Sequence, residues 1–121
     1  MSFLTIRNAQ MAVFSEAMLR QFAVRTASRV KARFPEAVAA MTEDAVVERV
    51  LRTAQRARAH GVTRERDIEQ FIDFEFLYGP EFENRHLEPG QILARSEIDG
   101  ARKMALIENW ELFDRPERSH W

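Results

Sequence analysis

Apolar side chains recur with the period of an α-helix between Gly61 and Phe82, in the stretch GVTRERDIEQFIDFEFLYGPEF. Thr63 is of a residue type that caps helix starts, and Gly79 followed by Pro80 is typical of a helix end. Four apolar residues fall along one side of this helix and three more widen it: Ile68, Phe71, Ile72 and Phe76, then Phe74, Leu77 and Tyr78. The segment therefore predicts an amphipathic helix whose apolar side is covered by other helices.

Two helices are predicted before this one. The first lies within residues 5–34, with Asn8 as its N-cap and Pro35 as its stop. Its apolar residues at helical spacing are Met11, Phe14, Ala17, Met18, Phe22, Val30 and Phe34. The second begins at Thr42, a capping residue that two acids follow, and runs to His60.

The second predicted helix has an apolar and a basic side, and Gly61 after it suits the left-handed position at a helix end. Five residues are expected to point inward: Ala45, Val46, Val50, Leu51 and Ala54. Four arginines are expected on the outside: Arg49, Arg52, Arg56 and Arg58.

The chain changes character after Gly79. Residues 80–90 hold two prolines and a glycine and are predicted to form a loop, and residues 91–97 a short helix. Asp99 is the expected cap of a last helix over 101–113, and residues 115–121 read as a flexible tail. The side chains expected to dock this last helix on the core are Met104, Ile107, Trp110 and Leu112 or Phe113.

Together these elements predict an all-α fold, a compact single-domain bundle of about five helices spanning residues 1–121. No run of four or more residues alternates as a strand would. The expected core joins the central helix to the two before it: Ile68, Phe71, Ile72 and Phe76 against Phe14, Met18, Phe22, Val50 and Leu51.

Composition narrows the function classes. The chain has 121 residues, of which 45% are apolar, enough for one core. Its net charge of −1 gives no overall bias toward nucleic acid or anionic lipid, and zero cysteines exclude disulfides and thiol catalysis. Neither a signal peptide nor a run near the ~18 apolar residues of a membrane span is found. The prediction is a cytoplasmic protein without a membrane partner.

Candidate catalytic residues are scattered. His60, His86 and His120 lie in separate segments, and none has a second histidine three or four residues away, as a preassembled zinc site needs. Five carboxylates of the central helix are expected mostly on its solvated face: Glu65, Asp67, Glu69, Asp73 and Glu75. Acid–base chemistry would need one of these carboxyls to be buried. The sequence therefore predicts a protein that is not an enzyme and has no catalytic, cofactor-binding or metal-binding residues.

The second and central helices, joined by the short turn GVT, have the layout of a helix-turn-helix DNA-binding motif. The helix that would enter the groove carries Arg64 and Arg66 but five acids, which phosphates repel. DNA binding is therefore a lesser alternative, and no specific nucleic-acid partner is predicted.

Three segments resemble small uncharacterised bacterial proteins encoded beside type VI secretion effectors and their adaptors: TIRNAQMAVF, ARFPEAVAAM and AHGVTRERDIEQFIDFEFLYGPEF. In such proteins a basic helix ends in a Phe-Pro step, and a Gly-[IV]-x-x-[ED]-x-D-[IV] segment leads into an aromatic helix closed by Gly-x-x-[FW]. The matching residues here are Phe34, Pro35, Gly61, Val62, Glu65, Asp67, Ile68, Gly79 and Phe82. The resemblance implies a co-chaperone or adaptor that modulates effector loading or, alternatively, an immunity protein that neutralises a cognate toxin.

Charge points to a partner surface. Residues 1–60 carry 10 Lys/Arg against 5 Asp/Glu, whereas residues 61–121 carry 8 against 14. A face of one sign speeds encounter with an oppositely charged partner. The predicted partner-binding residues lie on the acidic side of the central helix and in the loop beyond it: Glu65, Glu69, Asp73, Glu81, Phe82 and Glu83.

The expected partner is another protein, namely an effector, a chaperone or a spike-tip component. The arginines of the second helix form the alternative face if the acidic one is only solvated. The sequence leaves the oligomeric state open. It also leaves open whether four aromatic rings belong to the core or to an interface: Phe82, Trp110, Phe113 and Trp121.

Overall fold

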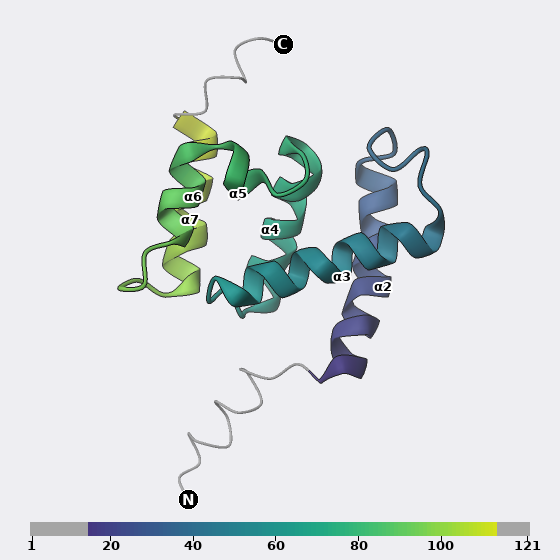
Figure 1. The fold of residues 1–121 in the computed structure, drawn as a ribbon. Coiled ribbons are helices and arrows are strands. Elements are labelled where there is room, and N and C mark those ends of the chain that lie inside the picture. The colour runs from purple at the N-terminus through teal and green to yellow at the C-terminus, as the bar shows by residue number, and fades with distance from the viewer. Residues whose placement is uncertain (1–14, 114–121) are drawn as a thin grey trace, which may run out of the picture.

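A computed structural model describes residues 15–113, and every regular element in it is a helix (Figure 1). The helices are α2 (Glu16–Arg33), α3 (Glu43–Ala59), α4 (Glu65–Tyr78), α5 (Phe82–Arg85), α6 (Leu87–Leu93) and α7 (Gly100–Phe113). No strand occurs among these residues, and the prediction of an all-α, compact helical bundle is confirmed. The predictions for Asn8, Met11, Phe14, Trp121 and the tail 115–121 fall outside the described residues.

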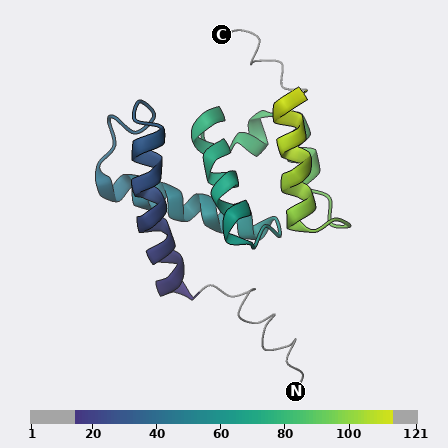
Figure 2. The same ribbon diagram turned by 180° about the vertical axis from the view of Figure 1, so that it is seen from behind.

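The helices form two layers. Figure 1 shows α3 crossing in front of α2 and α4, and α6 lying in front of α7. The view from behind in Figure 2 shows α2, α4 and α7 side by side in the other layer. Helix α4 occupies the middle of that layer, so it has a helix on each side and α3 against its inner face. The helix predicted between Gly61 and Phe82 thus lies at the centre of the fold.

Helix α4 supplies the centre of the hydrophobic core. The four residues expected along its apolar side are buried: Ile68, Phe71, Ile72 and Phe76. Leu77, which was predicted on the same covered side, is instead 46% exposed. Their expected neighbours Phe22, Val50 and Leu51 belong to the same buried cluster. Met18 does not, since it is 51% exposed. The buried stripe of α2 follows a line beside Met18: Leu19, Phe22, Ala23, Thr26, Ala27 and Val30.

Several predicted helix ends are confirmed, but α2 begins at Glu16 with Ser15 as its N-cap, later than the start predicted for the first helix. The Thr42 hydroxyl accepts a hydrogen bond from the Ala45 N–H at 3.1 Å, and the Asp99 carboxylate accepts one from the Arg102 N–H at 2.8 Å. Gly79 has a φ of 99° after the last residue of α4. The cap predicted at Thr63 is wrong: α4 begins at Glu65 with Arg64 as its N-cap, so Thr63 lies one residue too early to cap it.

The predicted loop over residues 80–90 is instead mostly helical, and the short helix predicted over 91–97 is α6, which begins earlier at Leu87. Pro89 falls in the first turn of α6, where no backbone N–H is required of it. Gly90 allows α6 to approach α5, since a Cβ there would lie 2.4 Å from the Glu83 carbonyl oxygen. Proline and glycine, the residue types that suggested a loop, therefore lie where α5 and α6 pack closely together.

Lys103 joins the ends of three helices. Its side chain is buried, and Nζ donates hydrogen bonds to the carbonyl oxygens of His60 at 2.8 Å and Leu93 at 2.9 Å. His60 is the C-cap of α3, and Leu93 is the last residue of α6. Carbonyls at helix ends lack partners within their own helix, and a lysine is a favourable donor to them. Lys103 on α7 therefore binds α3 and α6 together.

Replacing Lys103 by methionine should lower the free energy of unfolding by about 1–3 kcal/mol, because two inward-facing carbonyls lose their donor. Urea unfolding measures this directly. Lys31→Met is the matched control, since the side chain of Lys31 is substantially exposed and, within residues 15–113, pairs only with the exposed Glu43, so its loss should change stability little. Equal urea midpoints for the two variants would contradict a structural role for the Lys103 hydrogen bonds.

Candidate functional site

The six residues predicted to bind a partner do not form one surface. Phe82 is fully buried, and its ring centroid lies 5.0 Å from that of Phe71 and 5.6 Å from that of Phe74. Glu83 is buried too and forms an ion pair with Arg56 at 2.9 Å. Phe82 and Glu83 therefore cannot belong to an exposed partner surface, and Phe82 takes the core position that the sequence left open.

A buried carboxylate, Glu75, organises the turn after α4. Only 2% of its side chain is exposed, although the sequence analysis expected it on the solvated face. It accepts hydrogen bonds from Arg49 Nε at 3.0 Å, from Arg56 Nη2 at 2.7 Å and from the Glu81 N–H at 3.0 Å. Glu81 has a φ of 55°, which non-glycine residues seldom adopt, and its bond to Glu75 holds the chain there. The role of Glu75 is structural.

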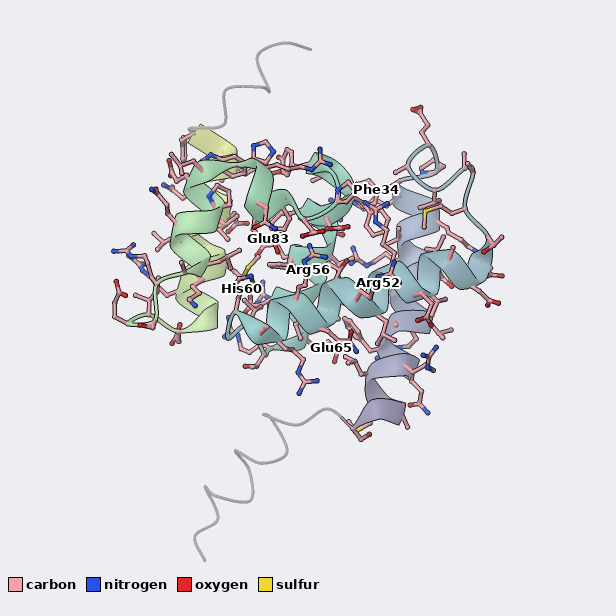
Figure 3. All side chains as sticks on the ribbon, in the orientation of Figure 1. Phe34, Arg52, Arg56, His60, Glu65 and Glu83 are labelled. Carbon is pink, nitrogen blue, oxygen red and sulfur yellow. The ribbon has the colours of Figure 1, made fainter. Side chains whose placement is uncertain are left out.

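The arginines of α3 were predicted to lie outside, and for Arg49 and Arg56 this is wrong. Both turn toward Glu75 of α4, and Arg56 also reaches Glu83 of α5. Each guanidinium also lies over an aromatic ring, Arg49 over Phe76 at 4.2 Å and Arg56 over Phe71 at 5.7 Å. Arg52, Arg56 and His60 follow one another along α3, with Glu83 next to the last two (Figure 3). These contacts are tertiary, so helix periodicity alone does not reveal them.

Two titratable groups of this cluster have shifted pKa values. Burial alone would raise the pKa of Glu83, but the hydrogen bond and charge of Arg56, a backbone hydrogen bond and the nearby His60 lower it below its usual value. Burial lowers the pKa of His60, and the charges of Lys103 and Arg56 add to this, against the opposing effect of Glu83. Both shifts follow from contacts that hold the fold together.

Three acids of α4, namely Asp67, Glu69 and Asp73, line a groove between α4 and α7, which we call the α4/α7 groove. Its volume is about 450 Å³, and part of α2 closes one side. It is lined by Arg29, Arg64, Arg66, Asp67, Glu69, Gln70, Asp73, Ala101, Ala105 and Glu108. Of the predicted partner residues, Glu69 and Asp73 thus lie in one groove. Glu65 lies apart from it and pairs with Arg25 at 3.4 Å.

Helices α4 and α7 run in the same direction along the groove (Figure 2). Their starts are close, since a Cβ at Gly100 would lie 2.2 Å from the Gly61 carbonyl oxygen, and near their ends the Tyr78 hydroxyl donates to Glu111 at 2.6 Å. Each helix presents one stripe at steps of four, three and four residues: Arg66, Gln70, Asp73 and Leu77 on α4, and Ala101, Ala105, Glu108 and Leu112 on α7.

Two exposed leucines continue the stripes beyond the residues that line the groove. Leu77 is 46% exposed and Leu112 is 59% exposed, and the two stripes place them at the same end of α4 and α7. Trp110, one of the four rings left open by the sequence, is buried against Tyr78 at 5.6 Å. The prediction that Leu112 or Phe113 docks on the core is wrong, since Phe113 is 75% exposed as well.

Charges inside the groove are only partly paired. Asp73 accepts hydrogen bonds from Arg29 at 2.9 Å and Arg33 at 3.1 Å, and Arg64 pairs with Asp67 at 2.8 Å. Three charged side chains of the groove form no ion pair within residues 15–113: Arg66, Glu69 and Glu108. Nε of Arg29 is a buried donor without an acceptor in the same part of the chain. The groove therefore offers two free carboxylates and the free guanidinium of Arg66.

Sequence reasoning found the acidic side of α4 but missed the groove. The α7 side of it consists of two alanines and Glu108, none of which suggests binding by itself. The only signal was the spacing of Ala101, Ala105 and Glu108, which places small residues along one helix face. Small side chains there leave room for another segment to approach α7 closely.

Comparisons of the chain with protein-family models, with curated proteins and with solved structures found no match. Within residues 15–113, no helix is both long and apolar enough to cross a membrane. Those residues also hold no group of three or more His, Cys, Asp or Glu side chains arranged to bind a metal ion.

Proposed function

We propose that this chain is a non-enzymatic protein-binding protein that holds a segment of its partner in the α4/α7 groove. The observation that carries the proposal is the groove itself, with free carboxylates of Glu69 and Glu108 along it and exposed Leu77 and Leu112 at one end. Protein interfaces combine an apolar anchor with surrounding polar groups that fix orientation. The groove offers both kinds of contact.

The groove chemistry specifies the occupant. Lysine or arginine side chains of the partner would pair with Glu69 and Glu108, and apolar side chains would cover Leu77 and Leu112. Ala101 and Ala105 leave space for a helix backbone, as small residues do where two helices approach closely. The occupant is therefore an amphipathic helical segment with basic residues on its contact side.

The resemblance to proteins encoded beside type VI secretion effectors supports a choice of partner. On that basis the partner is an effector, a chaperone or a spike-tip component, and the chain acts as a co-chaperone or adaptor that modulates effector loading. The alternative from the same resemblance is an immunity protein, which would bind a toxin and abolish its activity. Helix-turn-helix DNA binding is less favoured, since α4 is flanked by α2 and α7 and exposes Glu69.

The test uses the products of the neighbouring genes, each purified and titrated against the chain over a salt series. Glu69→Lys combined with Glu108→Lys should slow association with the cognate product roughly tenfold at low salt and flatten its salt dependence, because two attractive charges become repulsive. Asp73 is left unchanged, since reversing it would break its ion pairs with Arg29 and Arg33.

Glu36→Lys combined with Glu88→Lys is the matched control, because both residues are exposed, lie outside the groove, form no ion pair within residues 15–113 and give the same change in net charge. Equal association rates for the two double variants would refute the groove as the binding site. Failure of every effector, chaperone and spike-tip product to bind would refute the adaptor role. Binding that abolishes the activity of a toxin would favour the immunity alternative.

A further inference from the structure

A second hollow lies on the opposite layer of the molecule, between α3 and the turn that follows α4. Its volume is about 280 Å³. It is lined by Arg49, Arg52, Thr53, Arg56, Glu75, Pro80 and Glu81. We propose that this hollow, the α3 hollow, binds a single oxyanion group, either a carboxylate or a phosphate, through the guanidinium groups of Arg49 and Arg52.

Arg49 is held ready for such a ligand. Its Nε donates to Glu75 at 3.0 Å, and its guanidinium lies over the Phe76 ring at 4.2 Å from the centroid, so the side chain is fixed at both contacts. The two terminal nitrogens form no hydrogen bond within residues 15–113, and neither is buried without a hydrogen-bond partner. A fixed guanidinium loses little side-chain entropy when its remaining N–H groups bind an oxyanion.

Arg52 lies one helical turn after Arg49 and provides the second set of donors. It is exposed and forms neither an ion pair nor a hydrogen bond in the described part of the chain. Residues three apart on a helix are neighbours, so the two guanidinium groups can reach the same ligand. Arginine donates two parallel N–H bonds to a carboxylate or phosphate, which makes the pair suited to oxyanions.

The acids around the hollow do not cancel this preference. Both oxygens of Glu75 already accept hydrogen bonds, and Oε1 of Glu81 accepts one from Asn84 Nδ2 at 3.0 Å. Arg56 uses its nitrogens on Glu75, Glu83 and Thr53, so it contributes charge rather than donors. The lining residues carry a net charge of +1, and Glu83, which pairs with Arg56, brings the cluster to zero, so the preference for an oxyanion rests on the free N–H groups of Arg49 and Arg52.

The site is tested by titration with inorganic phosphate and with acetate at constant ionic strength. Binding is monitored by the NMR signals of the Thr53 and Glu81 amides and of the Arg49 Nε–H. We expect saturable shifts at these groups. Arg52→Ala should weaken the saturable binding about tenfold, the loss expected for one charged hydrogen-bonding contact. Arg102→Ala is the control, because Arg102 is an exposed arginine on α7, away from the hollow.

The two salts distinguish the ligand class. Saturation by phosphate alone assigns the hollow to a phosphate group, and saturation by acetate alone or by both assigns it to carboxylates or to oxyanions in general. Linear shifts, or equal affinities for the Arg52→Ala and Arg102→Ala variants, would overturn the proposal, because weak non-specific anion binding gives both results. The result is independent of the α4/α7 groove, since none of the groove residues lines the α3 hollow.

Discussion

Replacing Phe71 by alanine should lower the free energy of unfolding by about 3–5 kcal/mol, the range measured for truncating a buried phenylalanine. The Phe71 side chain is fully buried at the centre of the core. Its ring packs against Phe82 at a centroid distance of 5.0 Å, and the imidazole of His60 lies 6.3 Å away. Truncation would therefore open a cavity between α3, α4 and α5 that the surrounding helices cannot readily fill.

Phe113→Ala is the control for Phe71→Ala, since it removes the same atoms from a ring that is 75% exposed. It should change the free energy of unfolding by no more than about 0.5 kcal/mol, as surface substitutions usually do. Chemical unfolding followed by circular dichroism measures both variants. Equal stabilities would mean that Phe71 is not the central core residue.

The α3 and α4 helices could be predicted because local signals and the apolar pattern agree there. Thr42 caps α3, Gly61 follows it with a φ of 86°, and Gly79 ends α4. The periodic apolar residues between these limits are buried, which is what an amphipathic helix requires of its neighbours. Capping geometry and helix period depend on residues close in sequence, so one sequence suffices to read them.

The region after α4 could not be predicted because its structure depends on contacts between distant residues. Pro89 and Gly90 suggested a loop, yet they allow α6 to begin early and to approach Glu83 of α5. Phe82 follows a helix stop in a polar stretch, but Phe71 and Phe74 enclose it. Turn propensities are properties of single residue types. They carry no information about which helix will pack against a given residue.

Only part of the candidate site could be predicted from the sequence. Glu69 and Asp73 were assigned to a partner surface from the acidity of α4, and the structure places both in the α4/α7 groove. The groove exists only because α7 runs beside α4. This arrangement is set by Gly100, the first residue of α7, which packs against the turn before α4, and by Trp110 in the core. That pairing is a property of the fold rather than of either helix.

Glu75 shows why charge patterns along a helix are an uncertain guide to its exposed side. Periodicity placed Glu75 with the solvated acids of α4, but two arginines of α3 reach it from the neighbouring layer. A buried carboxylate is tolerated where its oxygens are fully hydrogen-bonded. The sequence offered only the basic side of α3 as a hint, and that basic side was read as solvated.

Glu75→Ala should cost about 3–5 kcal/mol of unfolding free energy, the range for removing one partner of a buried ion pair. The variant leaves Arg49 and Arg56 without their shared acceptor and frees the Glu81 N–H, so the left-handed turn after α4 loses its support. Glu69→Ala is the control on the same helix, since Glu69 forms no ion pair within residues 15–113, and it should change stability by less than about 0.5 kcal/mol.

A double-mutant cycle separates the ion pair from the volume of the Glu75 side chain. Glu75→Leu keeps an apolar group in the site but leaves Arg49 unpaired, whereas adding Arg49→Met removes the unpaired charge as well. Replacing both partners of a buried pair by apolar residues is often far less costly than removing one, so the second substitution should restore part of the stability that the first removes. Residues in direct contact typically show coupling energies of about 0.5–3 kcal/mol. Additive effects of the two substitutions would show that the Arg49–Glu75 contact contributes nothing to stability beyond the packing of each side chain.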